Sequence, residues 1–224
     1  MDGILIVDKP KGATSHDIVD FVRKRFSVQK VGHAGTLDPE ATGVLVLLVG
    51  KWTKRSQEFT NSDKEYQACL TLGIATDTWD AHGRIIKKEK LKSITTQKIE
   101  QAFSQFLGEI EQVPPMFSAI RHQGKRLYSL ARQGIELQRS KRQVHIYKLQ
   151  ITEINFPDIN FLVSCSKGTY IRSLCVDIAR ALGCLGYLSA LRRVSCGRFT
   201  LAQALSLENL KNFSDPELEQ ALLR

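Results

Sequence analysis

Apolar positions near the start of the chain predict a strand, a helix and a second strand, in that order. The continuous apolar run GILIVDKP, residues 3–10, is typical of a buried strand. A helix with Ser15 as its N-cap is predicted next, because apolar residues recur at helical spacing: Ile18, Phe21, Val22 and Phe26. The run GVLVLLVG, residues 43–50, predicts the second strand, although periodicity alone does not separate so short a run from a buried helix.

The middle of the chain alternates between polar surface segments and half-buried elements. Residues 51–64 are polar and basic, which predicts a short helix and a loop at the surface. Residues 64–73 alternate apolar and polar positions, as a strand does, and carry Tyr66 on the apolar face. A loop and a short strand at 84–88 follow. The next helix is predicted from about Thr95, with the apolar face Ile99, Ala102, Phe103, Phe106 and Leu107 and with Gly108 closing it.

Two strands and an amphipathic helix are predicted in the C-terminal half. Residues 144–156 and 160–168 form the strands, which can pair around Pro157. The helix covers GTYIRSLCVDIARALG, with Gly183 as its C-cap. Its first turn contains Arg172, where the positive end of the helix dipole gives a cation no support. This placement is either incidental or offset by a carboxylate partner.

The chain is predicted to end with a strand in VSCGRFTL and two short helices, the last capped by Asp215 with Pro216 at its first position. Strands and helices do not alternate regularly, so the sequence predicts an α+β fold rather than a parallel βαβ sheet. The 224 residues are expected to form one domain, 1–224, with a small insertion at about 90–145.

Composition and charge suggest the kind of partner. The chain is 42% hydrophobic and 25% charged, as in ordinary globular proteins, and its net charge of +9 suits a polyanion such as nucleic acid. Cations interleaved with the aromatic Tyr128 are concentrated in the basic segment, defined as residues 112–142. RNA matches this mixture, because cations neutralise phosphates and aromatic rings stack on unpaired bases. The alternative is a solvated basic face.

The cysteines and the lengths of the apolar runs indicate the compartment. Five cysteines show neither a C-x-x-C pair nor zinc-ligand spacing, which suggests reduced thiols that serve as packing groups. No apolar run approaches the ~20 residues of a membrane span. The start of the chain also lacks the pattern of a secretory signal. We therefore expect a soluble cytoplasmic protein without membrane association.

A glycine-rich turn, VGHAGTLDPEATGVL at residues 31–45, carries the candidate catalytic group Asp38. Its glycines permit positive φ and close approach of a ligand, and Pro39 biases Asp38 away from the helical region. A carboxylate held beside His33 and Thr36 is a candidate for chemistry. The alternative is that Asp38 serves only as a turn or helix-cap residue, with Pro39 at the first helical position.

Taken together, the motifs resemble the TruB family of tRNA pseudouridine synthases. The matching segments are GILIVDKPKGATSHDIV, KVGHAGTLDPEATGVL, KEYQACLTLG, PPMFSAIRHQGKRLYSLARQG, CSKGTYIRSL and LRRVSCGRF. They occur in the family's order and cover nearly the whole chain. The resemblance implies the pseudouridine synthase fold, in which helices and loops flank a central mixed, mostly antiparallel sheet. It also implies isomerisation of uridine to pseudouridine at position 55 in the T-arm of tRNA, without a cofactor or metal.

The resemblance assigns roles to particular residues. Asp38 matches the catalytic aspartate, Tyr66 the tyrosine that stacks on the uracil, and Arg172 the arginine that pairs with the aspartate. His33 matches the histidine that presses into the T-loop when the target base flips out. The weaker substrate-binding assignments are Lys9, Leu191, Gly32, Thr36, Arg121, Lys125 and Tyr128. We expect a monomer that needs no protein partner besides its tRNA substrate.

The chain departs from the family's pattern in two respects. Family members commonly continue into a small C-terminal RNA-binding domain of the PUA type, which we do not expect here. Trp79 and His82 occupy loop positions where smaller or acidic residues are expected.

Two other functions compete with catalysis. A binding module, such as a tRNA-folding chaperone or the core of an RNA-guided complex, would not need Asp38, Tyr66 and Arg172. A glycosidase-like hydrolase usually requires two carboxylates.

Overall fold

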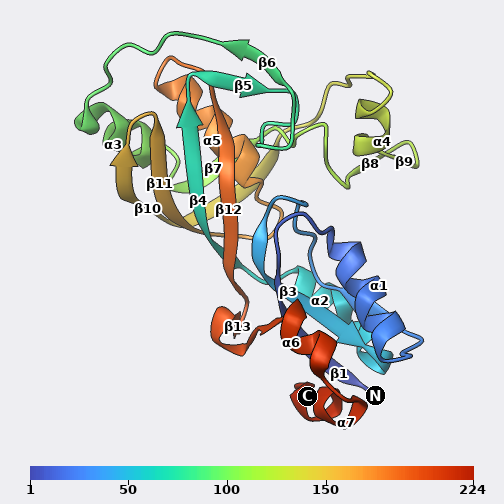
Figure 1. Cartoon of the computed structure of the whole chain (residues 1–224). Coiled ribbons are helices and arrows are strands. Elements are labelled where there is room, and N and C mark those ends of the chain that lie inside the picture. The colour runs from blue at the N-terminus through green and yellow to red at the C-terminus, as the bar shows by residue number, and fades with distance from the viewer. The chain divides into compact units, whose positions relative to one another are not determined.

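The computed structural model describes the backbone of residues 1–224 and all side chains except those of Arg121, His122 and Arg126. The chain forms two compact units (Figure 1). Unit 1 contains residues 1–67 and 191–224, and unit 2 contains residues 68–190. Strands β4 (Lys64–Leu72) and β12 (Gly186–Cys196) run from one unit into the other. The expected single catalytic domain stays a prediction.

Unit 1 is built on a mixed sheet with the strand order β14-β1-β3-β12. Strand β1 (Gly3–Lys9) pairs antiparallel with β3 (Thr42–Val49), so that Lys9 lies opposite Gly43. The pairs β1–β14 and β3–β12 are parallel. The shorter strands are β2 (Val31–His33) on β3, β13 (Phe199–Thr200) on β12, and β14 (Leu205–Ser206) on β1.

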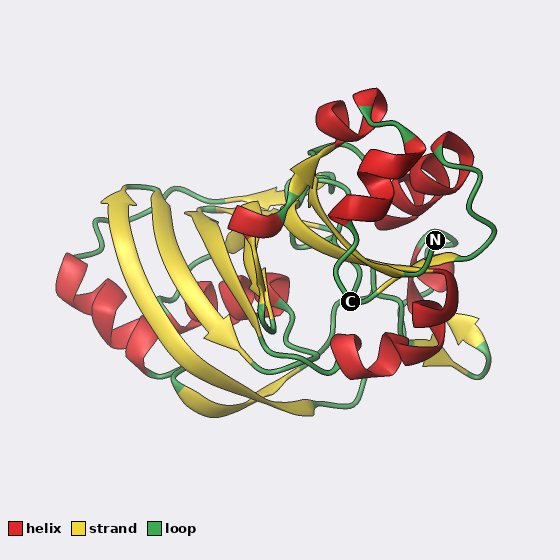
Figure 2. Ribbon diagram, turned by 90° about the horizontal axis from the view of Figure 1, so that it is seen from below, coloured by secondary structure: helices red, strands yellow, loops and turns green.

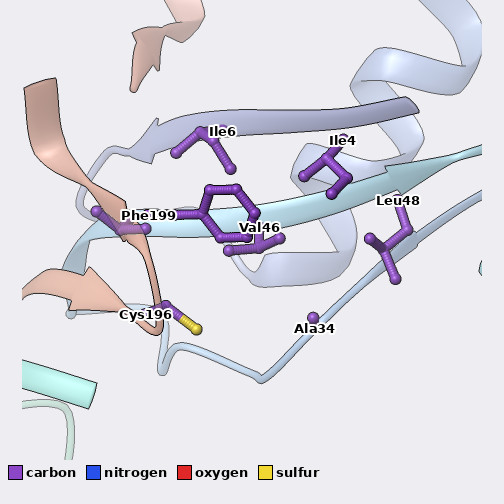
Figure 3. Packing of buried hydrophobic residues seen from close by; sticks show 8 residues of the cluster. Ile4, Ile6, Ala34, Val46, Leu48, Cys196 and Phe199 are labelled. Atoms are coloured by element: carbon purple, nitrogen blue, oxygen red, sulfur yellow. The ribbon is translucent and has the colours of Figure 1, made fainter. Parts of the chain in front are cut away.

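Both faces of β1 and β3 are buried, which explains why these strands read as unbroken apolar runs. Successive side chains of a strand point to opposite faces, so one face carries Ile4, Ile6, Val46 and Leu48. Figure 3 shows these side chains gathered with those of other parts of unit 1: Ala34, Cys196 and Phe199. This core fixes the sheet on which the candidate site is built.

Short helices complete unit 1. They are α1 (Ser15–Arg25), η1 (Gly50–Arg55), α2 (Ser56–Thr60), η2 (Leu201–Gln203), α6 (Leu207–Asn212) and α7 (Asp215–Ala221). Two predicted caps were wrong by one residue. Thr14, not Ser15, caps α1 through a capping box with Asp17, and Ser214, not Asp215, caps α7. Ser15 is buried and its hydroxyl binds elsewhere, as described below.

Unit 2 contains a second stretch of sheet with the order β12-β4-β11-β10-β7. Strands β10 (Arg142–Asn155) and β11 (Asp158–Cys165) form the predicted antiparallel hairpin, and β7 (Gly108–Gln112) pairs antiparallel with β10. Two small hairpins are separate: β5 (Ile74–Thr76) with β6 (Ile85–Lys88), and β8 (Arg121–His122) with β9 (Lys125–Arg126).

Helices α3 (Thr96–Ser104), α4 (Leu127–Ala131) and α5 (Ile171–Ala181) belong to unit 2. Both units contain helices, red in Figure 2, as well as strands, which are yellow. The α3 ring of Phe103 packs edge-on against Phe161 of β11, with ring centroids 5.3 Å apart. The predicted extension of α3 to Gly108 was wrong, because Gly108 begins β7 and Leu107 is 55% exposed. Gly183 follows α5 with φ +74°, as a C-terminal glycine does.

The α+β prediction is therefore confirmed, with a mixed sheet and flanking helices. Among the residues that the structure describes, no helix is long and apolar enough to cross a membrane.

Candidate active site

Asp38 lies in unit 1, in the connection between β2 and β3 that we call the Asp38 loop, residues 34–41. The carbonyl oxygen of Asp38 accepts a hydrogen bond from the amide of Ala41 at 3.1 Å, which closes a turn. No helix begins at Pro39, so the helix-cap alternative was wrong. The side chain therefore belongs to a turn between two strands of the sheet.

The peptide groups on both sides of Asp38 are held by neighbouring elements. On one side, the hydroxyl of Ser15 on α1 accepts a hydrogen bond from the Leu37 amide at 2.8 Å and donates one to the Leu37 carbonyl at 3.1 Å. On the other side, the Pro39 carbonyl accepts hydrogen bonds from the Gly12 amide at 2.9 Å and from Lys9 Nζ at 3.0 Å. The backbone that carries Asp38 is thus fixed at both flanking residues.

Lys9 is a fully buried lysine at the end of β1. Its Nζ also donates to the carbonyls of Pro10 at 2.8 Å and Ala13 at 2.6 Å. Burial lowers the pKa of Lys9 to about 8, an effect that the negative charges of Asp38 and Glu40 oppose. The structure therefore places Lys9 beside the Asp38 loop, as a group that binds main-chain carbonyls.

Arg193 of β12 is a second buried cation at this loop, and the sequence analysis missed it. Its side chain is 1% exposed, with Nε 2.7 Å from the Val44 carbonyl and Nη2 3.2 Å from the Gly35 carbonyl. Opposite it in the sheet, Gly43 has φ +101°, and an added Cβ there would lie 2.2 Å from the Arg193 carbonyl oxygen. The motif LRRVSCGRF contains both Arg192 and Arg193, and no local signal separates them.

The other expected residues of unit 1 occupy different places. His33 ends β2 and is half-buried, and its pKa is lowered first by burial and then by the nearby side chains of Arg193 and His16. Its Nδ1 has no hydrogen-bond partner among the described residues. Tyr66 is only 8% exposed, on β4. Thr36 is exposed, whereas Gly32 in β2 and Leu191 in β12 are partly buried.

Arg172 lies in unit 2, in the first turn of α5, and is 5% exposed. The structure supplies a carboxylate partner there, because Asp80 Oδ2 lies 3.6 Å from Arg172 Nη1. The guanidinium also donates to the carbonyls of Thr78 at 3.2 Å and Phe117 at 2.9 Å. The pairing of Arg172 with Asp38, which belongs to unit 1, stays a prediction.

Asp80 is the centre of the loop between β5 and β6, and the sequence analysis did not single it out. Its Oδ1 accepts hydrogen bonds from the Thr78 hydroxyl at 2.6 Å and from the His82 amide at 3.0 Å. The preceding residue, Trp79, has φ +65°, and the Arg139 guanidinium lies 5.8 Å above its ring. The Asp-Thr-Gly content of this segment indicated a loop but did not reveal which carboxylate turns inward.

The basic segment contributes a further group of expected residues. Lys125 in β9 is exposed, and the guanidinium of Arg132 lies 5.6 Å above the ring of Tyr128 in α4. The side chain of Arg121, also expected to bind RNA, lies outside the described residues. Among the described side chains, no group of three or more His, Cys, Asp or Glu is placed to hold a metal ion.

Family models and curated proteins match nearly the whole chain. Residues 23–171 match the model of the TruB family pseudouridylate synthase N-terminal domain, and residues 172–224 match that of the tRNA pseudouridylate synthase B C-terminal domain. The tRNA pseudouridine synthase B of Alkaliphilus oremlandii is 48% identical over 97% of this chain and 72% of its own length. That of Protochlamydia amoebophila is 47% identical over 100% of this chain and 84% of its own length.

Solved structures show the same fold. A chain of a Cbf5-Nop10-Gar1 complex superposes with a TM-score of 0.75 and 32% identity, over 94% of this chain and 54% of that chain. A chain of an H/ACA RNP bound to a substrate RNA containing 2'-deoxyuridine gives a TM-score of 0.73 and 28% identity, over 98% of this chain and 56% of that chain. The chain spans just over half the length of these two chains. The matching models and relatives confirm the resemblance seen in the motifs, and the chain belongs to the TruB family of pseudouridylate synthases.

Proposed function

We propose that this protein isomerises uridine to pseudouridine at position 55 in the T-arm of tRNA, with Asp38 as the catalytic carboxylate. The observation that carries the proposal is the Asp38 loop in a chain of this family: the peptides on both sides of Asp38 are fixed by Ser15, Gly12 and Lys9. A carboxylate that is held by its backbone can meet the reacting sugar in one geometry, which is a main source of catalytic rate.

The reaction breaks the N1–C1′ bond of the uridine, turns the base and forms a C5–C1′ bond. The C5 proton is lost and N1 gains a proton, so the atoms balance without a cofactor. An aspartate is ionised near neutral pH, as both available mechanisms require, namely attack on C1′ or removal of a sugar proton. Both mechanisms need C1′ and C5 exposed together, so the target base must flip out of the folded loop, at roughly a few kcal/mol.

The remaining roles belong to side chains that would surround the flipped base. We propose that Tyr66 stacks on the uracil and assists removal of the C5 proton, and that His33 takes the place of the base in the T-loop. Burial favours the neutral form of His33, because it lowers the pKa of the imidazole. A neutral ring enters a base stack without the desolvation cost of a cation. Arg172, oriented by Asp80, would pair with the Asp38 carboxylate.

The test is conversion of an unmodified T-arm stem-loop, followed by chemical mapping of pseudouridine. The wild-type protein should convert one uridine, and Asp38→Asn should convert none while it binds the same RNA. Asp20→Asn is the matched control, because Asp20 is a partly exposed aspartate of α1 in the same unit and should keep wild-type conversion. Conversion by Asp38→Asn would contradict the proposed mechanism. RNA binding without conversion by the wild type would favour a binding module.

We further propose that the protein acts on tRNA as a monomer in the cytoplasm, without an obligate protein partner. The net charge of +9 supports a polyanionic partner directly. Analytical ultracentrifugation with and without tRNA tests the stoichiometry. Two protein chains on one tRNA would contradict the monomer.

A further inference from the structure

Arg193 is a buried charge that the proposed reaction does not use. Its side chain is 1% exposed, yet none of the described carboxylates lies within ion-pair distance of it. Its hydrogen bonds go to two main-chain carbonyls. Burying a cation without a paired anion costs free energy of folding. A side chain that bears this cost usually has a role beyond filling space in the core. The neighbouring Arg192 shows the usual arrangement: it is half-exposed and lies 2.7 Å from the Asp8 carboxylate.

The two carbonyls that Arg193 binds lie on either side of Asp38 in the chain. Gly35 stands near the start of the loop, and Val44 lies just beyond its end, in β3. The guanidinium therefore connects the residue near the start of the loop to the strand that follows the loop. The backbone of Arg193 lies close against that of Gly43 in β3, because a Cβ added at Gly43 would come within 2.2 Å of the Arg193 carbonyl oxygen.

We infer that Arg193 is a positioning residue that sets the geometry of Asp38 by joining the start of its loop to the strand that follows the loop. The inference rests on the proposed role of Asp38. Ser15 from α1 and Lys9 from β1 hold the middle of the loop, and Arg193 from β12 binds near its start and just beyond its end. Three separate elements thus bind main-chain atoms in the loop, at Gly35, Leu37 and Pro39, and Arg193 also binds the start of β3 at Val44.

Arginine suits this place better than lysine does. The planar guanidinium carries several N–H donors in a rigid fork, so it can reach two carbonyls in fixed directions. The ammonium of lysine is a compact donor on a flexible stem, as Lys9 illustrates with its three converging carbonyls. Arg193→Lys keeps the charge and much of the volume but replaces the rigid fork with a flexible ammonium, which does not fix the directions of the two hydrogen bonds. Arg193→Lys therefore separates the effect of the positive charge from the effect of the hydrogen-bond geometry.

Variants of Arg193 should change kcat more than KM. Because Arg193 is buried beneath the loop, it does not contact RNA, and Arg193→Lys should leave KM within about 3-fold of wild type. A misplaced catalytic group costs on the order of 10–100-fold in rate for shifts near 1 Å, so kcat should fall by that amount. Arg193→Gln, which lacks both the fork and the charge, should lose at least as much.

The experiment compares these variants with Leu210→Ala, in steady-state and single-turnover assays on the T-arm stem-loop and by amide hydrogen exchange. Leu210 is fully buried in α6 and has no hydrogen bond to the Asp38 loop, so its truncation lowers stability alone. Exchange should accelerate at Leu37 and Ala41, whose amides are bonded in the loop, in Arg193→Lys but not in Leu210→Ala. Leu210→Ala should retain wild-type kcat below its melting temperature.

The outcomes separate this inference from the proposed function. If the wild type converts uridine and Arg193→Lys matches it in kcat and in loop exchange, Arg193 does not position Asp38. If both Arg193→Lys and Leu210→Ala lose kcat in proportion to their loss of stability, the effect is structural and the inference is also overturned. If the wild type converts no uridine, the proposed function fails, while the exchange result still reports on the loop.

Discussion

At the scale of single residues, the site depends on side chains that bind main-chain atoms. Ser15 uses one hydroxyl to satisfy both the amide and the carbonyl of Leu37. Both of these main-chain groups are buried and would otherwise lack partners from the regular sheet. One small side chain of α1 therefore stabilises the residue that precedes Asp38.

Ser15→Ala should lower the free energy of unfolding by about 1–3 kcal/mol, because the buried Leu37 groups lose their partner. Conversion of uridine should slow as well, since Leu37 is adjacent to Asp38. Urea unfolding and single-turnover kinetics measure the two effects. Ser206→Ala, which removes the exposed cap of α6, is the control and should leave the conversion rate unchanged. Unchanged stability in Ser15→Ala would contradict the role given to the hydroxyl.

Lys9 makes the stability of the protein depend on pH. Its pKa is about 8 in the folded protein and near 10.5 in the unfolded chain, so the unfolded chain binds more protons between these values. The contribution of Lys9 to the free energy of unfolding should therefore rise from pH 8 towards pH 10.5, and stay constant below about pH 7. The difference in unfolding free energy between wild type and Lys9→Met, measured by urea unfolding across this range, isolates the effect. A difference that does not change with pH would contradict it.

The sequence predicted the catalytic candidate but not its supports, for a physical reason. Asp38 sits in a local motif of glycines and proline, which the sequence displays directly. The hydroxyl of Ser15 acts on a residue 22 positions away, and Arg193 acts on carbonyls about 150 positions away. The sequence around Ser15 predicts that this residue caps the helix, but in the structure the neighbouring Thr14 is the cap. Hydrogen bonds between residues so far apart in sequence depend on the tertiary fold, so no local sequence motif indicates them.

At the scale of elements, the loop between β5 and β6 holds Arg172 through Asp80. Asp80→Ala should destabilise the protein by up to about 3–5 kcal/mol, because it removes a buried carboxylate from beside a buried guanidinium. The control Asp77→Ala removes the pair with the highly exposed Arg84 and a hydrogen bond from the Arg84 amide, so it should cost less, about 1–2 kcal/mol. Thermal unfolding and denaturant titration compare the two. Equal losses would contradict the contribution given to the buried pair of Asp80 and Arg172.

Predictions of elements succeeded where periodicity was long and failed at boundaries. The β10–β11 hairpin and α5 were expected at nearly their observed positions, because each carries a clear pattern of period two or of helical period. The predicted end of α3 was wrong, since Phe106 and Leu107 continue the apolar spacing after the helix has already ended at Ser104. The apolar residue Leu107 is 55% exposed, so the spacing did not report burial there, and β7 begins at the next residue, Gly108.

At the scale of the whole molecule, the positive charge should make RNA binding sensitive to salt. Each phosphate contact that is lost should reduce the slope of log affinity against log salt by about 0.7–0.9. Lys125→Ala in the basic segment should show this loss, and Lys87→Ala, which removes another exposed lysine, in β6, should not. Filter binding between low and moderate salt measures both slopes. Equal slopes for the two variants would contradict the basic segment as the RNA surface.

The Asp38 loop is held by hydrogen bonds to its main-chain atoms, and this has a practical consequence for engineering. Ser15, Lys9, Gly12 and Arg193 all bind peptide groups, which every amino acid possesses. The side chains of Thr36, Asp38 and Glu40 can therefore be exchanged without loss of these bonds. A library randomised at these three positions should keep the loop's backbone while its chemistry varies. The same property makes Asp38→Asn a suitable scaffold for trapping the unreacted RNA in crystals.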